Sequence, residues 1–296
     1  MEKKVETSRL EVAYEDNGDA SAPPIVLVHG FPDDAKTWER VSKPLVEAGF
    51  RTIAPYVRGY GETRFLNDST PRSGQIAALG SDLLEFTDAL GLERFALVGH
   101  DWGARATYIA ASMHPNRVSS LVNLAVGYGT NDPGQRLSPA QTRNYWYQWY
   151  FNLKKGKAEL DENRRAFCEH LWHAWSPNWN FSDDEFEKTA RSFDNDDFVD
   201  IAIHSYRHRW ANAEGDPEYD TLEERLAEPP KIHVPTTLLM GGADGATLAE
   251  TSEEKEGFFT KEYERRVLPG IGHFIQREAP GAVVDAVFER VRRDEA

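Results

Sequence analysis

The chain has 296 residues, of which 40% are hydrophobic, enough to bury one α/β core or a core with an inserted unit. Its formal net charge of -15 disfavours nucleic acid and anionic membranes as partners, and no run approaches the roughly 18 apolar residues of a membrane span. The single cysteine, Cys168, excludes an internal disulfide and a cysteine metal cluster. Neither end of the sequence resembles a targeting signal, so we expect a cytoplasmic protein, as a monomer or homodimer.

The first part of the chain alternates short apolar runs with longer helical patterns. Residues 8–15 alternate polar and apolar side chains, as a half-exposed strand does. Residues 24–28 are continuously apolar, which is typical of a central parallel strand. Up to residue 124 the sequence predicts further strands at 51–54, 94–98 and 118–124, and helices near 38–48, 75–90 and 104–111. This order predicts an α/β fold with a mainly parallel sheet of eight strands and helices on both faces.

The alternation breaks between residues 133 and 230, where the pattern is mostly helical and rich in Trp, Tyr and Phe. It resumes with strands at 234–240 and 263–268 and a helix near 279–291. We therefore expect one α/β core, formed by residues 1–132 and 231–296, and an inserted helical cap at residues 133–230.

The most informative segment is Gly99-His100-Asp101-Trp102-Gly103, between the strand at 94–98 and the helix at 104–111. It has the form of a nucleophile elbow, Gly-x-nucleophile-x-Gly. The glycines permit a tight turn that exposes the central side chain at the top of the sheet. A carboxylate nucleophile at Asp101 suits displacement at a saturated carbon, through an alkyl ester that water then cleaves.

An elbow nucleophile needs an acid and then a histidine further along the chain. Asp244 follows the strand at 234–240, and His273 lies in a glycine-rich loop after the strand at 263–268. Both fall at the carboxyl edge of the sheet, where open α/β sheets build their sites. Asp132, beyond the strand at 118–124, is a competing acid that lies further from its strand end.

The expected oxyanion hole consists of two backbone N–H groups, from Trp102 and from Phe31 in the loop after the strand at 24–28. A cis peptide bond before Pro32 would turn the Phe31 N–H inward.

The chain resembles the α/β-hydrolase-fold epoxide hydrolases in four features that span nearly the whole core. These are His29-Gly30-Phe31-Pro32, Arg58-Gly59-Tyr60-Gly61, the elbow around Asp101, and the Asp244/His273 pair. The resemblance implies the α/β-hydrolase fold, a covalent mechanism, a small-molecule epoxide as substrate and no cofactor.

Epoxide hydrolases of this kind use two cap tyrosines as proton donors to the epoxide oxygen. The segments 147–151 and 205–210 are similar to the two tyrosine segments, which implies Tyr147 and Tyr206, with Tyr150 as the replacement for Tyr147. A phenol with a pKa of about 10 can protonate the poor alkoxide leaving group, although aromatics at helical spacing usually line a core. We expect a hydrophobic or aromatic epoxide, bound by Trp102, Phe31, Tyr150 and Trp149.

Two other functions use the same residues. Haloalkane or haloacid dehalogenases share the Asp-His-Asp triad and need N–H donors for the halide, which here would come from Trp102 and from Trp149, Trp172 or Trp175. However, Phe31 stands where many haloalkane dehalogenases carry Asn, and Arg105 stands alone where fluoroacetate-type dehalogenases usually carry paired arginines. A non-catalytic ligand-binding protein would not need the complete nucleophile, acid and base. No metal site is expected, because His204 and His208 have metal-ligand spacing but no third ligand.

Overall fold

A central β-sheet organises the computed structural model, which describes residues 2–291. Its order is β1-β2-β4-β3-β6-β7-β8-β9, and a ninth strand, β5, pairs with β2. The strands are β1 (Glu2–Glu6), β2 (Leu10–Asn17), β3 (Pro24–Val28), β4 (Arg51–Pro55), β5 (Arg64–Phe65), β6 (Phe95–His100), β7 (Val118–Leu124), β8 (Thr236–Gly241) and β9 (Tyr263–Leu268). From β4 to β9 neighbouring strands are parallel, whereas β1, β2 and β5 pair antiparallel. The predicted mainly parallel sheet is confirmed.

Strands β1 and β5 were not expected from the sequence. Strand β1 is an exposed edge strand with the sequence EKKVE, so it lacks the apolar run or clear alternation that identifies a strand. Its lysines pair across the strand with acids of β2, Lys3 with Asp16 and Lys4 with Glu11. Charged side chains are common on edge strands because they discourage pairing with other chains.

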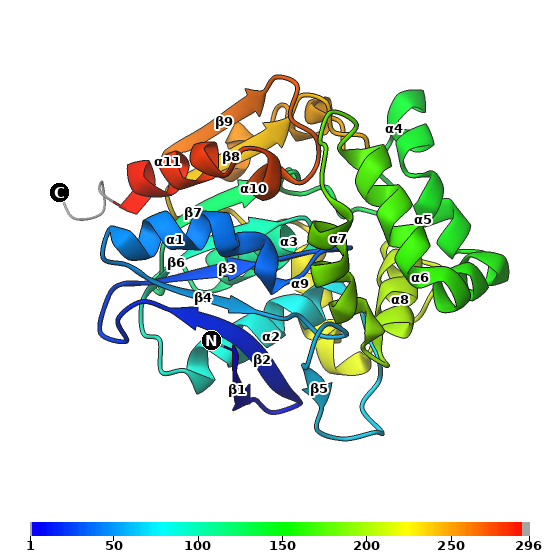
Figure 1. Cartoon of the computed structure of the whole chain (residues 1–296), viewed down its shortest axis with the longest axis horizontal. Helices are drawn as coiled ribbons and strands as arrows, with labels where there is room; N and C mark the ends of the chain where they lie inside the picture. The colour runs from blue at the N-terminus through cyan, green and yellow to red at the C-terminus, as the bar shows by residue number, and fades with distance from the viewer. Residues whose placement is uncertain (1, 292–296) are drawn as a thin grey trace.

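Helices cover both faces of the sheet (Figure 1). One face carries α1 (Glu39–Glu47), α10 (Ile275–Glu278) and α11 (Pro280–Val291), and the other carries α2 (Ile76–Ala89) and α3 (Trp102–Met113). Helix α3 is buried along almost its whole length. It approaches β3 so closely that a Cβ atom at Gly103 would lie 2.0 Å from the Val28 carbonyl oxygen. Glycine is therefore required at this end of the elbow.

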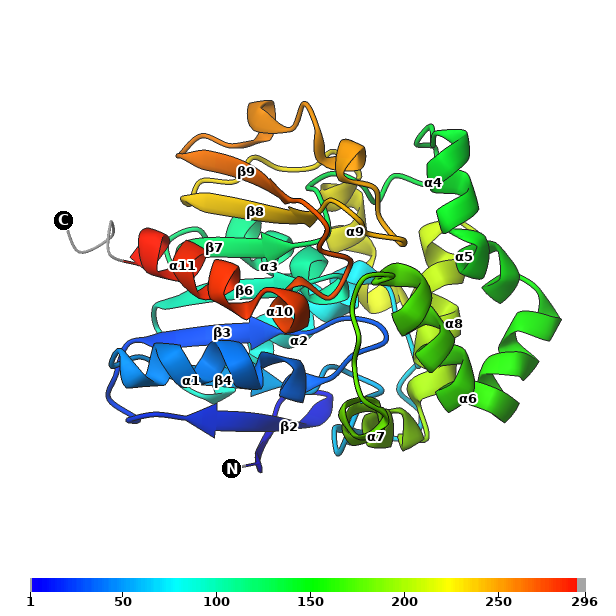
Figure 2. The same cartoon turned by 45° about the horizontal axis from the view of Figure 1, so that its top comes forward.

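The described chain between β7 and β8 is helical. It contains α4 (Pro139–Asn144), α5 (Trp146–Phe151), α6 (Lys154–Trp175), α7 (Asp183–Ala190), α8 (Phe198–Arg209) and α9 (Asp220–Ala227), with short 3-10 turns between some of them. Figure 2 shows α4 to α8 beyond the carboxyl ends of the parallel strands. We call α4 to α8 the helical insert. Helix α9 lies back against the core, where Leu222 and Leu226 pack against Ala77 and Ala78 of α2.

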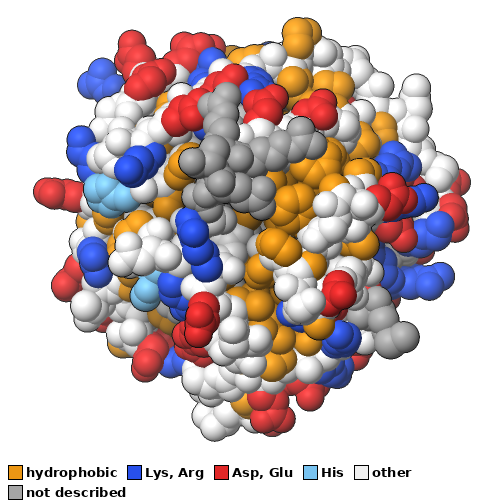
Figure 3. Space-filling model, turned by 90° about the vertical axis from the view of Figure 1, so that its left-hand side faces the viewer, with side chains coloured by type: hydrophobic (Ala, Val, Ile, Leu, Met, Phe, Trp, Pro, Cys, Tyr) orange, Lys and Arg blue, Asp and Glu red, His pale blue; other side chains and the backbone are white. Residues whose placement is uncertain are grey.

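The end of the molecule away from the helical insert is shown in Figure 3. Acidic and basic side chains are interspersed there with apolar and uncharged ones, despite the net charge of -15. Within residues 2–291, no helix has both the length and the apolar character needed to cross a bilayer.

Candidate active site

The elbow around Asp101 connects β6 to α3 at the edge of the sheet that faces the helical insert. Asp101 is the residue before α3 and has φ 51° and ψ -112°, a backbone conformation that is unfavourable for a side chain larger than glycine. Strain of this kind is stored at functional sites when the surrounding packing enforces it. The carboxylate is thereby held at the first turn of α3, where free backbone N–H groups favour negative charge.

Asp244 and His273 meet beside Asp101. The His273 Nδ1 atom lies 2.8 Å from Asp244 Oδ2, and its Nε2 atom lies 3.9 Å from Asp101 Oδ2. Asp244 Oδ1 accepts hydrogen bonds from the backbone N–H groups of Ala246 and Thr247 at 2.7 and 2.8 Å. The acid is thus fixed by its own loop, and it fixes the histidine ring in turn.

The competing acid, Asp132, is not brought to this group. It is exposed, and its Oδ1 accepts a hydrogen bond from the Gly134 N–H at 2.7 Å. Distance along the chain explains the difference, because Asp244 follows the last residue of β8 by three positions, whereas Asp132 follows the last residue of β7 by eight.

Backbone donors hold one oxygen of the Asp101 carboxylate. The Phe31 N–H donates to Asp101 Oδ1 at 3.0 Å, and the peptide bond between Phe31 and Pro32 is cis. The N–H groups of Trp102 and Phe31 both lower the pKa of Asp101. The two carboxylate oxygens are therefore distinct: Oδ1 is held by the backbone, and Oδ2 is the oxygen near His273.

Burial and charge perturb both ionisable groups. Burial raises the pKa of Asp101 above its ordinary value, and the nearby His273 and Arg105 oppose this shift. Burial lowers the pKa of His273, but the Asp244 and Asp101 carboxylates outweigh burial, so that its pKa lies above 6.5. Nε2 of His273 is buried and has no hydrogen-bond partner among residues 2–291. This nitrogen is thus the available proton acceptor of the group.

Tyr147 of α5 and Tyr206 of α8 meet over Asp101 from the side of the insert. Their ring centroids are 5.2 Å apart, and the Tyr206 ring packs 5.7 Å from Trp102 and 5.4 Å from Phe31. The Tyr147 hydroxyl accepts a hydrogen bond from Gln148 Nε2 at 2.7 Å, whereas the buried Tyr206 hydroxyl has no partner in the described part of the chain. Burial raises the pKa of both phenols, so both are protonated at neutral pH.

Two residues that were expected to bind substrate lie elsewhere. Tyr150 packs beside Trp146 and Phe167, and Trp149 packs at a tilt against Trp210 and donates its indole N–H to the Thr142 carbonyl. On α5, Trp149 follows Tyr147 by two residues and points away from its face, whereas Tyr150 follows by three residues and is separated only by its packing on Trp146 and Phe167.

Trp175 also lies at the site, although from the sequence it was considered only as a halide donor. Its ring lies 4.8 Å from the Tyr147 ring and 5.0 Å from the His273 ring, and its buried indole N–H has no partner within residues 2–291. Trp172, by contrast, donates its indole N–H to the Pro32 carbonyl at 2.8 Å. Nothing in the aromatic pattern of α6 separates these two tryptophans.

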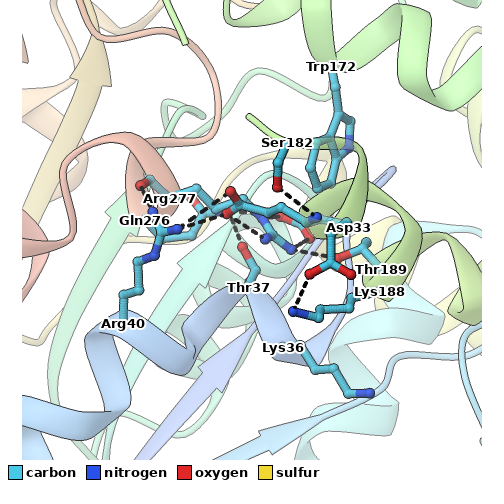
Figure 4. Close-up of polar contacts among 12 residues, drawn as sticks. Asp33, Lys36, Thr37, Arg40, Trp172, Ser182, Lys188, Thr189, Gln276 and Arg277 are labelled. Atoms are coloured by element: carbon cyan, nitrogen blue, oxygen red, sulfur yellow. Dashed lines mark hydrogen bonds and ion pairs between the residues drawn. The ribbon is translucent and has the colours of Figure 1, made fainter. Parts of the chain in front are cut away.

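A buried ion pair anchors the loop that carries Phe31 (Figure 4). The Arg277 guanidinium of α10 donates to both carboxylate oxygens of Asp33 and to the Thr189 hydroxyl of α7. The next residue, Asp34, accepts hydrogen bonds from Ser192 at 2.7 Å and from Thr189 at 3.4 Å. This cluster connects the loop that carries Phe31 to the helical insert. Two adjacent acids after Pro32 resemble an ordinary turn in the sequence, so this cluster was not predicted.

No group of three or more metal-ligating side chains that could hold an ion occurs in the described residues.

Comparison with known proteins agrees with this geometry. A family model of the alpha/beta hydrolase fold matches residues 23–280. The crystal structure of a candidate epoxide hydrolase from Klebsiella pneumoniae subsp. pneumoniae is 40% identical, with a TM-score of 0.94, and the match covers 98% of this chain and 97% of that one. Epoxide hydrolase A of Mycobacterium tuberculosis is 26% identical over 97% of this chain and 96% of its own length. Epoxide hydrolase A of Mycobacterium thermoresistibile is 25% identical, with a TM-score of 0.79, over 99% of this chain and 98% of that one.

The chain therefore belongs to the α/β-hydrolase fold family, in which it groups with the epoxide hydrolases. The predicted fold and the predicted hydrolase class are confirmed at this level.

Proposed function

We propose that the protein hydrolyses an epoxide to a vicinal diol through a covalent ester on Asp101. The observation that carries the proposal is the meeting of two sets of groups. Asp101, Asp244 and His273 come from the core, with 2.8 Å between His273 Nδ1 and Asp244 Oδ2, and two protonated phenols face Asp101 from the helical insert. Residues 133–230 act in this proposal as the cap that closes the site.

In the first step Asp101 Oδ2 attacks one ring carbon. The carbon–oxygen bond of the ring breaks, and Tyr147 and Tyr206 hydrogen-bond the departing oxygen while one of them gives it a proton. This assistance is needed because an alkoxide is a poor leaving group. The product is a β-hydroxyalkyl ester of Asp101, and backbone N–H groups continue to hold Oδ1.

In the second step His273 Nε2 removes a proton from water, which attacks the ester carbonyl carbon of Asp101. Negative charge develops on Oδ1, where the N–H groups of Phe31 and Trp102 stabilise it. The ester bond breaks, and the alkoxide takes the proton held by His273. The carboxyl proton left on Asp101 returns to the tyrosinate, and the diol leaves. Asp244 orients the imidazole and stabilises its charged form.

The dehalogenase alternative is less well supported by the same contacts. It would need tryptophan N–H groups aimed at the leaving group, and the indole N–H groups of Trp149 and Trp172 are engaged by carbonyl oxygens. Trp175 keeps a free donor, so the test includes a halide measurement.

The test is to incubate the protein with styrene oxide, an aliphatic epoxide and a terminal haloalkane, and to measure diol and halide. Asp101→Asn is the control, because it keeps the shape of the side chain and removes the nucleophile. We expect diol without halide, and loss of diol in the control. Halide without diol would assign a dehalogenase, and bound ligand without turnover would assign a binding protein.

A further inference from the structure

A large cavity lies beside the candidate active site. Its volume is about 790 Å³, and its lining includes Arg105, Asn131 and Arg209. The same three residues also line a narrow cavity of about 10 Å³ that reaches Trp102 and Tyr206. They therefore stand between the larger cavity and the catalytic groups. Because a space of this size scarcely holds one water molecule, a ligand that enters here must displace these side chains.

The two arginines come together at one loop from different helices. Arg105 Nη1 of α3 donates to Asn131 Oδ1 at 3.4 Å, and Arg209 Nη2 of α8 donates to the Thr130 carbonyl at 3.2 Å. Burial and the charge of Arg209 lower the pKa of Arg105 to about 10, so both guanidinium groups are charged at neutral pH. The sequence showed Arg105 alone, because Arg209 is more than 100 positions away along the chain.

These charges are only partly compensated by the protein: the Asp101 carboxylate acts on Arg105 from a distance, and the Arg209 guanidinium lies over the Tyr145 and Trp210 rings. No carboxylate of the described residues forms a salt bridge with either guanidinium, and the buried Nε of Arg209 has no hydrogen-bond acceptor. Three acids line the larger cavity, but Asp132 and Glu223 are engaged by the backbone N–H groups of Gly134 and Ala77, and Glu214 is exposed. A buried guanidinium ordinarily pairs with a carboxylate, which its planar fork of donors matches closely.

Arg105 and Arg209 each lie about one helical turn beyond a residue of the candidate active site, Asp101 and Tyr206 respectively. Arg105 follows Asp101 by four residues, and its backbone N–H donates to the Asp101 carbonyl. Arg209 follows Tyr206 by three residues on α8. Residues three or four apart lie on one helix face, about 5–6 Å from each other. A small molecule can therefore contact Asp101 and Tyr206 at one end and the two arginines at the other.

We propose that the substrate is an epoxide that carries a carboxylate a few bonds from the ring, and that Arg105 and Arg209 bind this carboxylate while Asp101 attacks the ring. The proposal rests on the epoxide hydrolase function proposed above. It replaces a purely hydrophobic or aromatic substrate with an amphiphilic or small acidic one.

The test compares 4,5-epoxypentanoate with its neutral amide, which has nearly the same shape. We expect wild-type kcat/KM to be roughly tenfold to a hundredfold higher for the acid, as charge-assisted hydrogen bonds allow. Arg105→Gln and Arg209→Gln should each lose most of this preference, mainly through KM, and Arg209→Lys should keep part of it. Arg143→Gln, which removes an exposed charge on α4 outside both cavities, is the matched control and should keep the preference.

The outcomes separate the two proposals. Equal kcat/KM for acid and amide, or an unchanged preference in both Gln variants, overturns the carboxylate site and leaves the epoxide hydrolase function standing. If neither of these epoxides is opened, nor styrene oxide nor the aliphatic epoxide, the proposed function fails. Titration calorimetry with pentanoate then decides the carboxylate site, because binding should be lost in Arg209→Gln and kept in Arg143→Gln. Halide release from chloroacetate, without diol from either epoxide, would keep the carboxylate site and overturn the epoxide as substrate.

Discussion

The two sides of the site are built in different ways. On the core side, the two carboxylates that position the site are held by several bonds each, Asp244 by two backbone N–H groups and His273, and Asp33 by the Arg277 guanidinium. His273 Nε2 is left without a partner among residues 2–291. On the side of the insert, the rings pack on one another, and the Tyr206 hydroxyl and Trp175 indole N–H are buried without partners in the described chain. A satisfied network fixes a single geometry, whereas unpaired buried donors are costly until a ligand accepts from them. In the proposed mechanism, the core side thus suits ester hydrolysis, which is the same for every substrate, and the insert side suits substrate recognition.

The largest expected effect separates these two tasks. His273→Gln removes the base but leaves Asp101 and both tyrosines, so alkylation should proceed and hydrolysis should stop. We expect turnover to fall by on the order of 10²–10⁴, and intact mass spectrometry should detect the protein with one epoxide added. Asp101→Asn is the control and should give no adduct. Turnover near the wild-type rate in His273→Gln would remove His273 from the mechanism.

Substitutions on the side of the insert should affect the other step, formation of the ester on Asp101. Tyr147→Phe and Tyr206→Phe each remove one hydroxyl that could assist the leaving oxygen, so both should slow formation of the ester, by roughly tenfold to a hundredfold each. The double variant should be nearly inactive, and no adduct should accumulate in the His273→Gln background. Tyr150→Phe is the matched control, because that ring packs against Trp146 and Phe167. Full activity in the double variant would leave the two rings as packing only.

The contrast between the two sides also explains what could be predicted from sequence. Asp101, Asp244 and His273 each follow a strand that the apolar pattern identifies, and parallel strands bring their carboxyl ends to one edge. The same logic could not choose among the aromatic residues of the insert. Tyr147 and Tyr150 lie on one short helix, and only the packing of that helix separates them.

Pairs from distant elements were equally inaccessible to sequence reasoning. Arg277 is 244 positions from Asp33, and nothing local to α10 indicates that its guanidinium is buried. Arg209 and Arg105 come together only because α8 and α3 both direct a guanidinium to residues 130–131 of the loop after β7. The edge strand β1 was missed for a third reason, because its contacts with β2 are made by charged side chains rather than by an apolar face.

A smaller effect, on stability rather than chemistry, tests the connection between the two sides. Arg277→Met would leave Asp33 as a buried carboxylate without its partner, and we expect the free energy of unfolding to fall by about 3–5 kcal/mol. Lys157→Met, which breaks an exposed pair with Asp200 away from this cluster, should cost about 1 kcal/mol or less. Urea unfolding measures both. Similar losses in the two variants would show that burial does not set the strength of the Asp33–Arg277 pair.

The smallest expected effect concerns Asp34, whose carboxylate is bonded by side chains of the insert. Burial and the neighbouring Asp33 charge raise the pKa of Asp34 to about 7. An ordinary Asp in the unfolded chain titrates near 3.8, so between these values the folded protein holds a proton that the unfolded chain has lost. This group therefore makes stability fall as pH rises through that window, and the loss is complete above the folded pKa.

Asp34→Asn keeps the acceptor oxygen that caps the turn at Lys36 and cannot ionise, so it should remove this part of the pH dependence. Its melting temperature should be close to that of the wild type at about pH 5 and higher at about pH 8. Asp200→Asn, at an exposed position of α8, should show no such pH-dependent difference in melting temperature from the wild type. A constant difference between Asp34→Asn and the wild type at every pH would mean that Asp34 is ionised throughout. The carboxylates of Asp33 and Asp34 would then both be charged and buried beside Arg277, where the core and the insert meet.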